Sequence, residues 1–203
     1  MNILLFGSTG NIGSTILESL CGKGTIFCGS RAYDSQDIPA LDVVIWAQGA
    51  NMNDTIGQLD QHRFDQVMDA NLYFIIRSLD YLLKTQKLKD GARLCIISSV
   101  WQDSIARPNK FSYTVSKAGV GGLVRSAAVD LKSRDILINV ILPGPIDNEM
   151  TRSALTPEQI EKLPGFTDAR DICQLIDYTC FNNTSMTGQS LVVDHGFSLT
   201  KTL

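Results

Sequence analysis

The chain has 203 residues, of which 44% are hydrophobic and 19% are charged, and its formal net charge is −3. These values indicate one globular domain over residues 1–203 and argue against a nucleic-acid-binding protein, which is usually basic. No apolar run approaches the ~18 residues that cross a bilayer, and the N-terminal apolar run is too short and lacks the basic start of a signal peptide, so we expect a cytoplasmic protein without a membrane partner.

Short apolar runs alternate with helical stretches along the chain, as is typical of a parallel sheet covered by helices. We expect strands over residues 2–6, 25–28, 42–47, 93–97, 136–142 and 190–194. We expect helices over 11–21, 61–87, 112–133 and 168–181, and an irregular segment over 146–166. The predicted fold is α/β, a Rossmann-like doubly wound parallel sheet flanked by helices, whose ligands bind beyond the carboxyl ends of the strands.

The segment GSTGNIG joins the first strand to the first helix and has glycines at 7, 10 and 13. Gly7 permits a tight turn, Gly10 lets the backbone approach a pyrophosphate, and Gly13 allows the helix to pack closely on the strand. An anion there meets free backbone N–H groups and the positive end of the helix. The spacing differs from that of a P-loop, so we expect a dinucleotide site, with an ordinary turn as the alternative. The expected loop contacts to the cofactor are Gly7, Ser8, Thr9, Asn11, Ile12 and Gly13.

The second strand normally ends in an acidic residue that binds the adenosine ribose. Here Ser30 and Arg31 follow the strand instead. A hydroxyl and a guanidinium suit a 2′-phosphate, so the sequence predicts NADP(H) rather than NAD(H). In the alternative, Arg31 is a solvated loop residue and Asp34 binds the ribose.

The five cysteines are Cys21, Cys28, Cys95, Cys173 and Cys180, and they show no CxxC spacing. This scatter is typical of buried free thiols in a reducing cytosol, so we expect neither disulfides nor a metal site.

Several motifs in order resemble the short-chain dehydrogenase/reductase family nearly from end to end. After the glycine loop come ANL (70–72), IISSV (96–100), YTVSK (113–117), LINVILPGPID (137–147) and TGQSLVVDHG (187–196). The resemblance implies an NAD(P)H-dependent oxidoreductase that transfers hydride between a nicotinamide and a small-molecule carbonyl or alcohol substrate.

The chain also departs from the family pattern. The glycine spacing is closer to that of the extended branch, and the usual Asn-Asn-Ala-Gly reads WAQG (46–49), which keeps only Gly49. Eleven positions lead from Arg31 to Asp42, where the family fits a helix, a strand and a helix, so the fold is expected to be trimmed between its second and fourth strands. The segment SQDI (35–38) is a candidate remnant of the missing strand, with Asp37 near the adenine. His195 replaces a glycine, and we expect a structural role for it.

Tyr113 and Lys117 lie four residues apart, which places a phenol and an ammonium on one helical face. In isolation they could be an ordinary surface pair. Lowering a tyrosine pKa by ~3 units requires roughly 4 kcal/mol of differential stabilisation. By resemblance, Tyr113 is the acid/base, and Lys117 lowers its pKa and binds the nicotinamide ribose.

Two other polar residues complete the catalytic set that the resemblance implies. Ser99 ends a predicted strand 14 residues before Tyr113 and would hold the substrate oxygen, while Ser98 would face the opposite side. Asn71, on the preceding helix, would bond backbone groups and hold a water linked to the lysine.

The resemblance assigns further cofactor contacts to two strand ends. Ala47, Gln48 and Gly49 follow one strand, and Pro143, Gly144 and Ile146 follow another, with Ile146 beside the nicotinamide carboxamide. Asn148 takes the place of a threonine that often contacts phosphate. Residues 149–166 would form the substrate lid, whose sequence names no substrate.

Two alternatives remain open at this point. One is a non-catalytic NADP(H)-binding sensor or scaffold protein, which the trimmed segment favours. The other is an epimerase or dehydratase acting on a nucleotide sugar, which the short C-terminal region disfavours. By resemblance, the long helices over 61–87 and 112–133 pair across a two-fold axis, giving a homodimer or homotetramer.

Overall fold

The computed structural model describes residues 1–35 and 37–199. Its centre is a six-stranded sheet with the order β2-β1-β3-β4-β5-β6, in which all five pairings are parallel. The strands are β1 (Asn2–Phe6), β2 (Thr25–Gly29), β3 (Leu41–Trp46), β4 (Leu88–Ile97), β5 (Leu137–Pro143) and β6 (Ser190–Val193).

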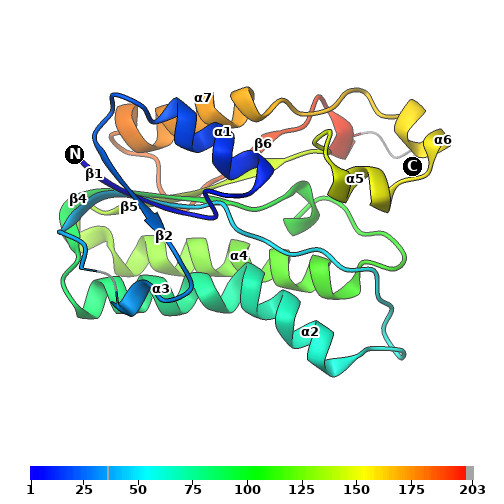
Figure 1. The fold of residues 1–203 in the computed structure, drawn as a ribbon, viewed down its shortest axis with the longest axis horizontal. Helices are drawn as coiled ribbons and strands as arrows, with labels where there is room; N and C mark the ends of the chain where they lie inside the picture. Colours follow the sequence, from blue (N-terminus) through cyan, green and yellow to red (C-terminus); the bar gives the residue numbers. More distant parts are fainter. Residues whose placement is uncertain (36, 200–203) are drawn as a thin grey trace.

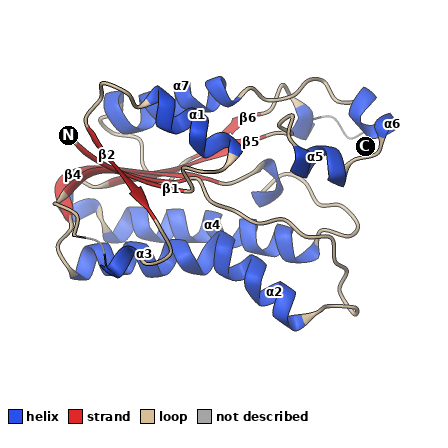
Figure 2. Ribbon diagram, in the orientation of Figure 1, coloured by secondary structure: helices blue, strands red, loops and turns tan. Residues whose placement is uncertain are grey.

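Helices cover both faces of this sheet, as Figure 1 and Figure 2 show. One layer holds α1 (Asn11–Ser19) and α7 (Ala169–Asp177), and the other holds α2 (Gln61–Met68), α3 (Phe74–Lys84) and α4 (Phe111–Asp130). Two short helices, α5 (Glu149–Ala154) and α6 (Pro157–Glu161), lie beyond the carboxyl end of β5. Short 3-10 turns span Tyr33–Ser35, Val100–Gln102, Lys132–Arg134 and Phe197–Leu199.

The alternation of side chains along the central strands separates two cores. Phe6 and Trp46 belong to the core beneath α2, α3 and α4. Ile3 and Ile45, on the same two strands, belong to the core beneath α1 and α7. All seven residues of β5 are buried, because helices cover both of its faces. The predicted Rossmann-like doubly wound sheet is therefore confirmed.

The predicted trimming is found at the β2 edge of the sheet. After β2 the chain makes the 3-10 turn at Tyr33–Ser35 and returns to the sheet centre as β3. Of the segment SQDI, Gln36 lies outside the described residues, and Asp37 and Ile38 form no strand. The proposed remnant strand is therefore not found among the described residues, and β2 is left as the edge strand.

The helix predicted over 61–87 is interrupted and shorter than expected. A π-helical turn at Asp69–Tyr73 separates α2 from α3, and α3 ends at Lys84. Gln86 then adopts a φ of 54°, a left-handed conformation that does not continue a helix. Strand β4 starts five residues earlier than predicted, at Leu88, which pairs with Leu41 before a register shift.

The segment 146–166 was expected to be irregular, and that prediction is wrong. The side chain of Asn148 accepts a hydrogen bond from the Thr151 backbone N–H at 2.8 Å and caps the start of α5. Pro157 opens α6, where its fixed φ favours a first helical turn. Near the C-terminus, the helix predicted over 168–181 is α7 followed by a π-helical turn at Tyr178–Asn182.

The prediction of buried thiols is correct for Cys95 and Cys180 only. Cys21 and Cys28 are exposed, and Cys173 is half-buried. Cys21 lies just after α1, and Cys28 lies on the edge strand β2, so the sheet and its helices do not enclose these thiols. None of the described helices is both long and apolar enough to cross a membrane.

Candidate active site

The glycine loop holds the end of β1, the start of α1 and the end of β3 in close contact. Gly7 has a φ of +80°, and a Cβ there would come within 2.5 Å of the Gln48 backbone nitrogen. A Cβ on Gly13 would lie 1.9 Å from the Gly7 carbonyl oxygen, so α1 packs on the loop only with glycine there. A Cβ on Gly10 would meet only that same oxygen, at 3.5 Å, and Gly10, the N-cap residue of α1, has no side chain with which to cap the helix. The helix therefore presents its first N–H groups to a ligand.

The segment WAQG spans the end of β3 and shows why the first of the two asparagines is replaced. Trp46 is buried, stacks on Phe6 and donates its indole N–H to Ser78 Oγ at 2.9 Å, so this position belongs to the core. Both polar atoms of the Gln48 side chain are buried and have no hydrogen-bond partner among the described residues. Buried amides are normally paired, so a bound ligand is a fitting partner for Gln48.

Asn71 ties the loop after β3 to α4 from its place in the π-helical turn. It is 1% exposed, and its Oδ1 accepts a hydrogen bond from the Ala50 N–H at 2.7 Å. Its Nδ2 donates to the Ala50 carbonyl and to Ser116 Oγ, both at 2.9 Å. A Cβ on Gly49 would lie 3.2 Å from Asn71 Oδ1 and 3.6 Å from Lys117 Nζ, so the loop, Asn71 and Lys117 meet at Gly49.

Tyr113 and Lys117 lie on one face of α4, as their spacing predicts. Lys117 Nζ is 5.7 Å from the centroid of the Tyr113 ring. The lysine is 4% exposed, and burial lowers its pKa to about 8. Burial raises the pKa of Tyr113, while the hydrogen bond with Ser99 acts in the opposite direction. The protein groups alone therefore do not produce the lowered tyrosine pKa that we expected, because desolvation outweighs the nearby polar groups.

Ser98 and Ser99 both line the cavity beside Tyr113. The expectation that their side chains face opposite sides stays a prediction. Strand β4 ends at Ile97, so the two serines directly follow its carboxyl end. Ser99 Oγ also accepts a long hydrogen bond from the Trp101 N–H, at 3.4 Å. Ser98 Oγ is buried and has no partner among the described residues.

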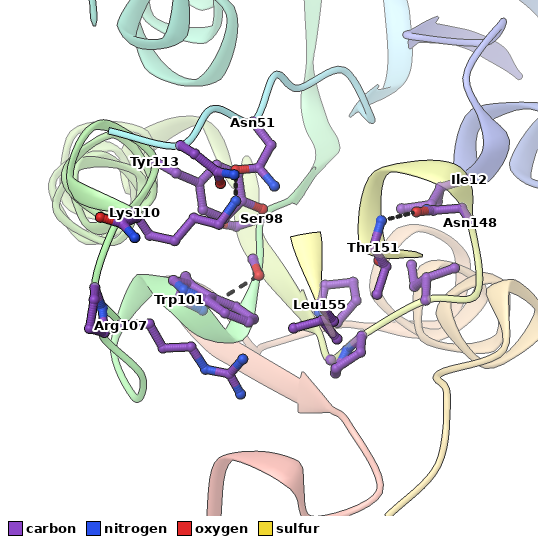
Figure 3. A pocket seen from close by; sticks show the side chains of 18 residues that line it. Ile12, Asn51, Ser98, Trp101, Arg107, Lys110, Tyr113, Asn148, Thr151 and Leu155 are labelled. Carbon is purple, nitrogen blue, oxygen red and sulfur yellow. Dashed lines mark hydrogen bonds between the residues drawn. The ribbon is translucent and has the colours of Figure 1, made fainter. Parts of the chain in front are cut away.

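The cavity has a volume of about 520 Å³ and lies beyond the carboxyl ends of β4 and β5. Figure 3 shows Ile12, Asn148 and Thr151 on one side, and Trp101, Arg107 and Lys110 on the other. The expected cofactor contacts Pro143, Gly144 and Ile146 also line it. Thr151 and Leu155, from the segment expected to form the substrate lid, line it as well. Asn51, Trp101, Arg107 and Lys110 also line it, and they were not among the expected site residues because they follow no periodic pattern.

Ser30 and Arg31 lie away from this cavity, at the β2 edge. Arg31 is 81% exposed, and its Nη1 is 3.9 Å from Asp69 Oδ2. Ser30 Oγ accepts a hydrogen bond from the Ala32 N–H at 3.2 Å. Asp34, the alternative ribose ligand, is exposed at the same edge. The candidate groups for the adenosine end are therefore solvent-facing.

Two further positions have clear local roles. Asn148 Oδ1 accepts the hydrogen bond that caps α5, so this oxygen already has a partner within the protein. The expected contact of Asn148 with a phosphate stays a prediction. His195 is exposed and has a φ of 52°, a conformation that favours the glycine usual in the family.

Solved structures with this architecture show what the fold resembles. A short-chain dehydrogenase family protein from Francisella tularensis superposes with a TM-score of 0.86 and 21% identity, covering 98% of this chain and 99% of that one. A structure of BdcA in complex with NADPH gives a TM-score of 0.84 at 20% identity, covering 97% and 93% of the two chains. A family model described as enoyl-(acyl carrier protein) reductase matches residues 33–198. The chain belongs to the short-chain dehydrogenase/reductase family.

Curated relatives in this oxidoreductase family include 3-oxoacyl-[acyl-carrier-protein] reductases. The Haemophilus influenzae protein is 26% identical over 237 residues, covering 97% of both chains. The Staphylococcus aureus protein is 28% identical over 164 residues, covering 77% of this chain and 66% of its own length. The chain thus matches just under two thirds of the length of the staphylococcal relative.

Proposed function

We propose that this chain is an NADP(H)-dependent short-chain reductase or dehydrogenase that interconverts a carbonyl compound and its alcohol. The observation that carries this proposal is the placement of Ser99, Tyr113 and Lys117 together at the carboxyl ends of the central strands. We further propose that residues 1–203 act as one dinucleotide-binding oxidoreductase domain in the cytoplasm.

The residues present fit a nicotinamide dinucleotide. The uncapped start of α1 suits the pyrophosphate, with Gly7 and Gly13 holding the loop close to the strands. The unpaired amide of Gln48 offers both a donor and an acceptor to a bound ligand. Ser30 and Arg31 suit a 2′-phosphate at the β2 edge, and Ile146 and Gly144 line the cavity where a nicotinamide would be held.

When bound, the nicotinamide would supply or accept the hydride. In the direction of reduction, Ser99 Oγ holds the carbonyl oxygen, and Tyr113 Oη donates the proton that this oxygen requires. A raised tyrosine pKa keeps the phenol protonated and ready to donate. Lys117 stabilises the phenolate that remains, and Asn71 positions Lys117 through the loop at Gly49 and Ala50.

The test is a titration of the protein with NADPH and NADH, followed by a screen of carbonyl compounds that monitors nicotinamide absorbance. The panel should include a 3-oxoacyl thioester, because the curated relatives are named for that group. We expect tighter binding of NADPH and turnover of at least one carbonyl compound. Tight NADPH binding without turnover across the panel would support the non-catalytic sensor or scaffold instead.

A further inference from the structure

The wall of the cavity opposite the glycine loop carries two cations, Arg107 and Lys110 (Figure 3). None of the described residues that line the cavity is an aspartate or a glutamate. The chain as a whole has a net charge of −3, so the local sign is opposite to that of the molecule. A cavity with this lining favours an anionic group on whatever enters it.

Arg107 is fixed by aromatic rings rather than by an acid. Its guanidinium carbon lies 5.5 Å from the ring centroid of Trp101 and 5.5 Å from that of Phe197. No carboxylate of the described residues lies within ion-pairing distance of Arg107. Burial lowers the pKa of Arg107, as expected for a partly desolvated cation that lacks a counter-ion. The two rings orient the group while its N–H donors stay available to a ligand.

Lys110 strengthens the positive wall. Its Nζ donates one hydrogen bond to Asn51 Oδ1 at 2.9 Å. Burial and the nearby Arg107 both lower the pKa of Lys110, while Asp54 acts against them. The Asp54 carboxylate is already bonded to the backbone N–H and the hydroxyl of Ser112. An ammonium has three donors, so Lys110 retains capacity for a ligand.

The arrangement separates this positive wall from the expected cofactor site. Ile12 belongs to the glycine loop and lies on the other side of the cavity, with Asn148. Ser99 and Tyr113, the groups that would hold a carbonyl oxygen, line the same cavity as the two cations. Because Arg107 lines the cavity and is half-buried, an anionic group on a molecule that enters the cavity can reach it.

We propose that the substrate of this site is a small carbonyl compound that also carries a carboxylate, which Arg107 and Lys110 bind while the carbonyl meets Ser99 and Tyr113. This inference rests on the proposed function and specifies its substrate class. Arg107 supplies planar paired donors and Lys110 a compact charge, a combination suited to a carboxylate.

The test compares each carbonyl acid with its own methyl ester. Suitable pairs are the formylbenzoic acids and straight-chain oxo acids, measured with the wild-type protein and NADPH. We expect kcat/KM to be about 10- to 100-fold higher for the acid, the size expected of charge-assisted hydrogen bonds. Arg107→Met should abolish most of that preference, measured as the ratio of kcat/KM for the acid to kcat/KM for its own ester.

Two further variants separate charge from packing. Arg107→Lys keeps the charge and should retain part of the acid preference. Lys84→Met removes an exposed lysine on α3, outside the cavity, and should leave the preference unchanged. An equal preference in wild type and Arg107→Met, or better turnover of the esters by wild type, would overturn the proposal.

A binding measurement keeps this proposal distinct from the proposed reaction. The same acid and ester pairs are titrated into the protein with NADP⁺ present, following the intrinsic fluorescence of Trp101 and Trp46 together. Tighter binding of the acid that is lost in Arg107→Met supports the anion site even if no pair is turned over. Equal binding of acid and ester overturns the anion site even if NADPH-dependent reduction is found.

Discussion

The Tyr113 side of the molecule and the β2 edge differ sharply in how they hold their functional groups. Lys117 is 4% exposed, and Asn71 beside it makes three hydrogen bonds. At the β2 edge, Arg31 is 81% exposed and Ser30 is exposed too, on a sheet trimmed to end at β2.

This difference indicates which property each region controls. Buried groups in a low-dielectric setting interact strongly, so the Tyr113 side should control the rate of reaction, and changes there should alter stability. Exposed groups contribute little to folding, so the β2 edge should tune cofactor choice without affecting the fold.

The largest expected effect is on the Tyr113 side. Tyr113→Phe removes the proton donor and keeps the ring, so kcat should fall by about 10²- to 10⁴-fold. NADPH binding should stay close to that of wild type, as measured by fluorescence titration. Tyr178→Phe, which alters an exposed tyrosine after α7, is the control and should leave kcat unchanged. Unchanged turnover in Tyr113→Phe would remove Tyr113 from the mechanism.

Lys117 gives the next largest effect, on stability. The pKa of Lys117 is about 8 in the folded state, against 10.5 ordinarily. Burying this cation therefore lowers the free energy of unfolding by about 3 kcal/mol. Below pH 8 both states are charged and this burial cost is fully present. As the pH rises from about 8 toward 10.5, the folded state loses the proton first, so the cost is relieved.

Lys117→Met lacks this pH dependence. By denaturant unfolding, the variant should be more stable than wild type at pH 7, and the gap should narrow by about 2 kcal/mol at pH 10. The exposed Lys84→Met variant should show no such change. A gap that stays constant between the two pH values would mean that Lys117 is not buried as a cation.

A smaller effect is expected at the β2 edge. Arg31→Ala should weaken NADPH binding by about 10-fold and leave NADH binding unchanged, because only NADPH carries the 2′-phosphate. The melting temperature should not move, since the ion pair that Arg31 makes with the described residue Asp69 is long and exposed. Arg63→Ala on α2 is the matched control. Equal losses for both cofactors, or tighter binding of NADH by wild type, would contradict the NADP(H) assignment.

The smallest expected effect is at His195. His195 has a φ of 52°, which strains a residue with a side chain but not glycine. His195→Gly should therefore stabilise the fold by about 0.5–1 kcal/mol, because relief of this backbone strain exceeds the entropy that glycine adds to the unfolded chain. Turnover should be unchanged, which kinetic assays and thermal unfolding together would check. A loss of activity would instead assign His195 a chemical role that its exposed position does not suggest.

The sheet was predictable because its strands are short apolar runs that local sequence reveals. Tyr113 and Lys117 were predictable because one helical turn joins them, and Ser99 because it follows a buried strand. The direction in which the Tyr113 pKa shifts was not predictable, because burial depends on the whole tertiary structure rather than on the neighbouring lysine.

Other features depend on contacts between distant segments. Arg107 packs on Phe197, 90 positions further along the chain, and no periodicity in residues 100–110 indicates this contact. The π-helical turn at Asn71 breaks a helix whose apolar spacing looked continuous. The expected homodimer or homotetramer stays a prediction, and light scattering would check it. The exposed apolar side chains Ile76 and Val129 lie on the helices expected to pair.

Hydride transfer itself is the central claim, and isotope labelling tests it most directly. The protein is incubated with NADPH carrying deuterium on the reactive nicotinamide carbon and with the carbonyl panel, and the alcohol products are analysed by mass spectrometry. The account predicts deuterium on the former carbonyl carbon of at least one product with wild type and a strongly reduced yield with Tyr113→Phe. Bound NADPH with no labelled alcohol from any compound would contradict it.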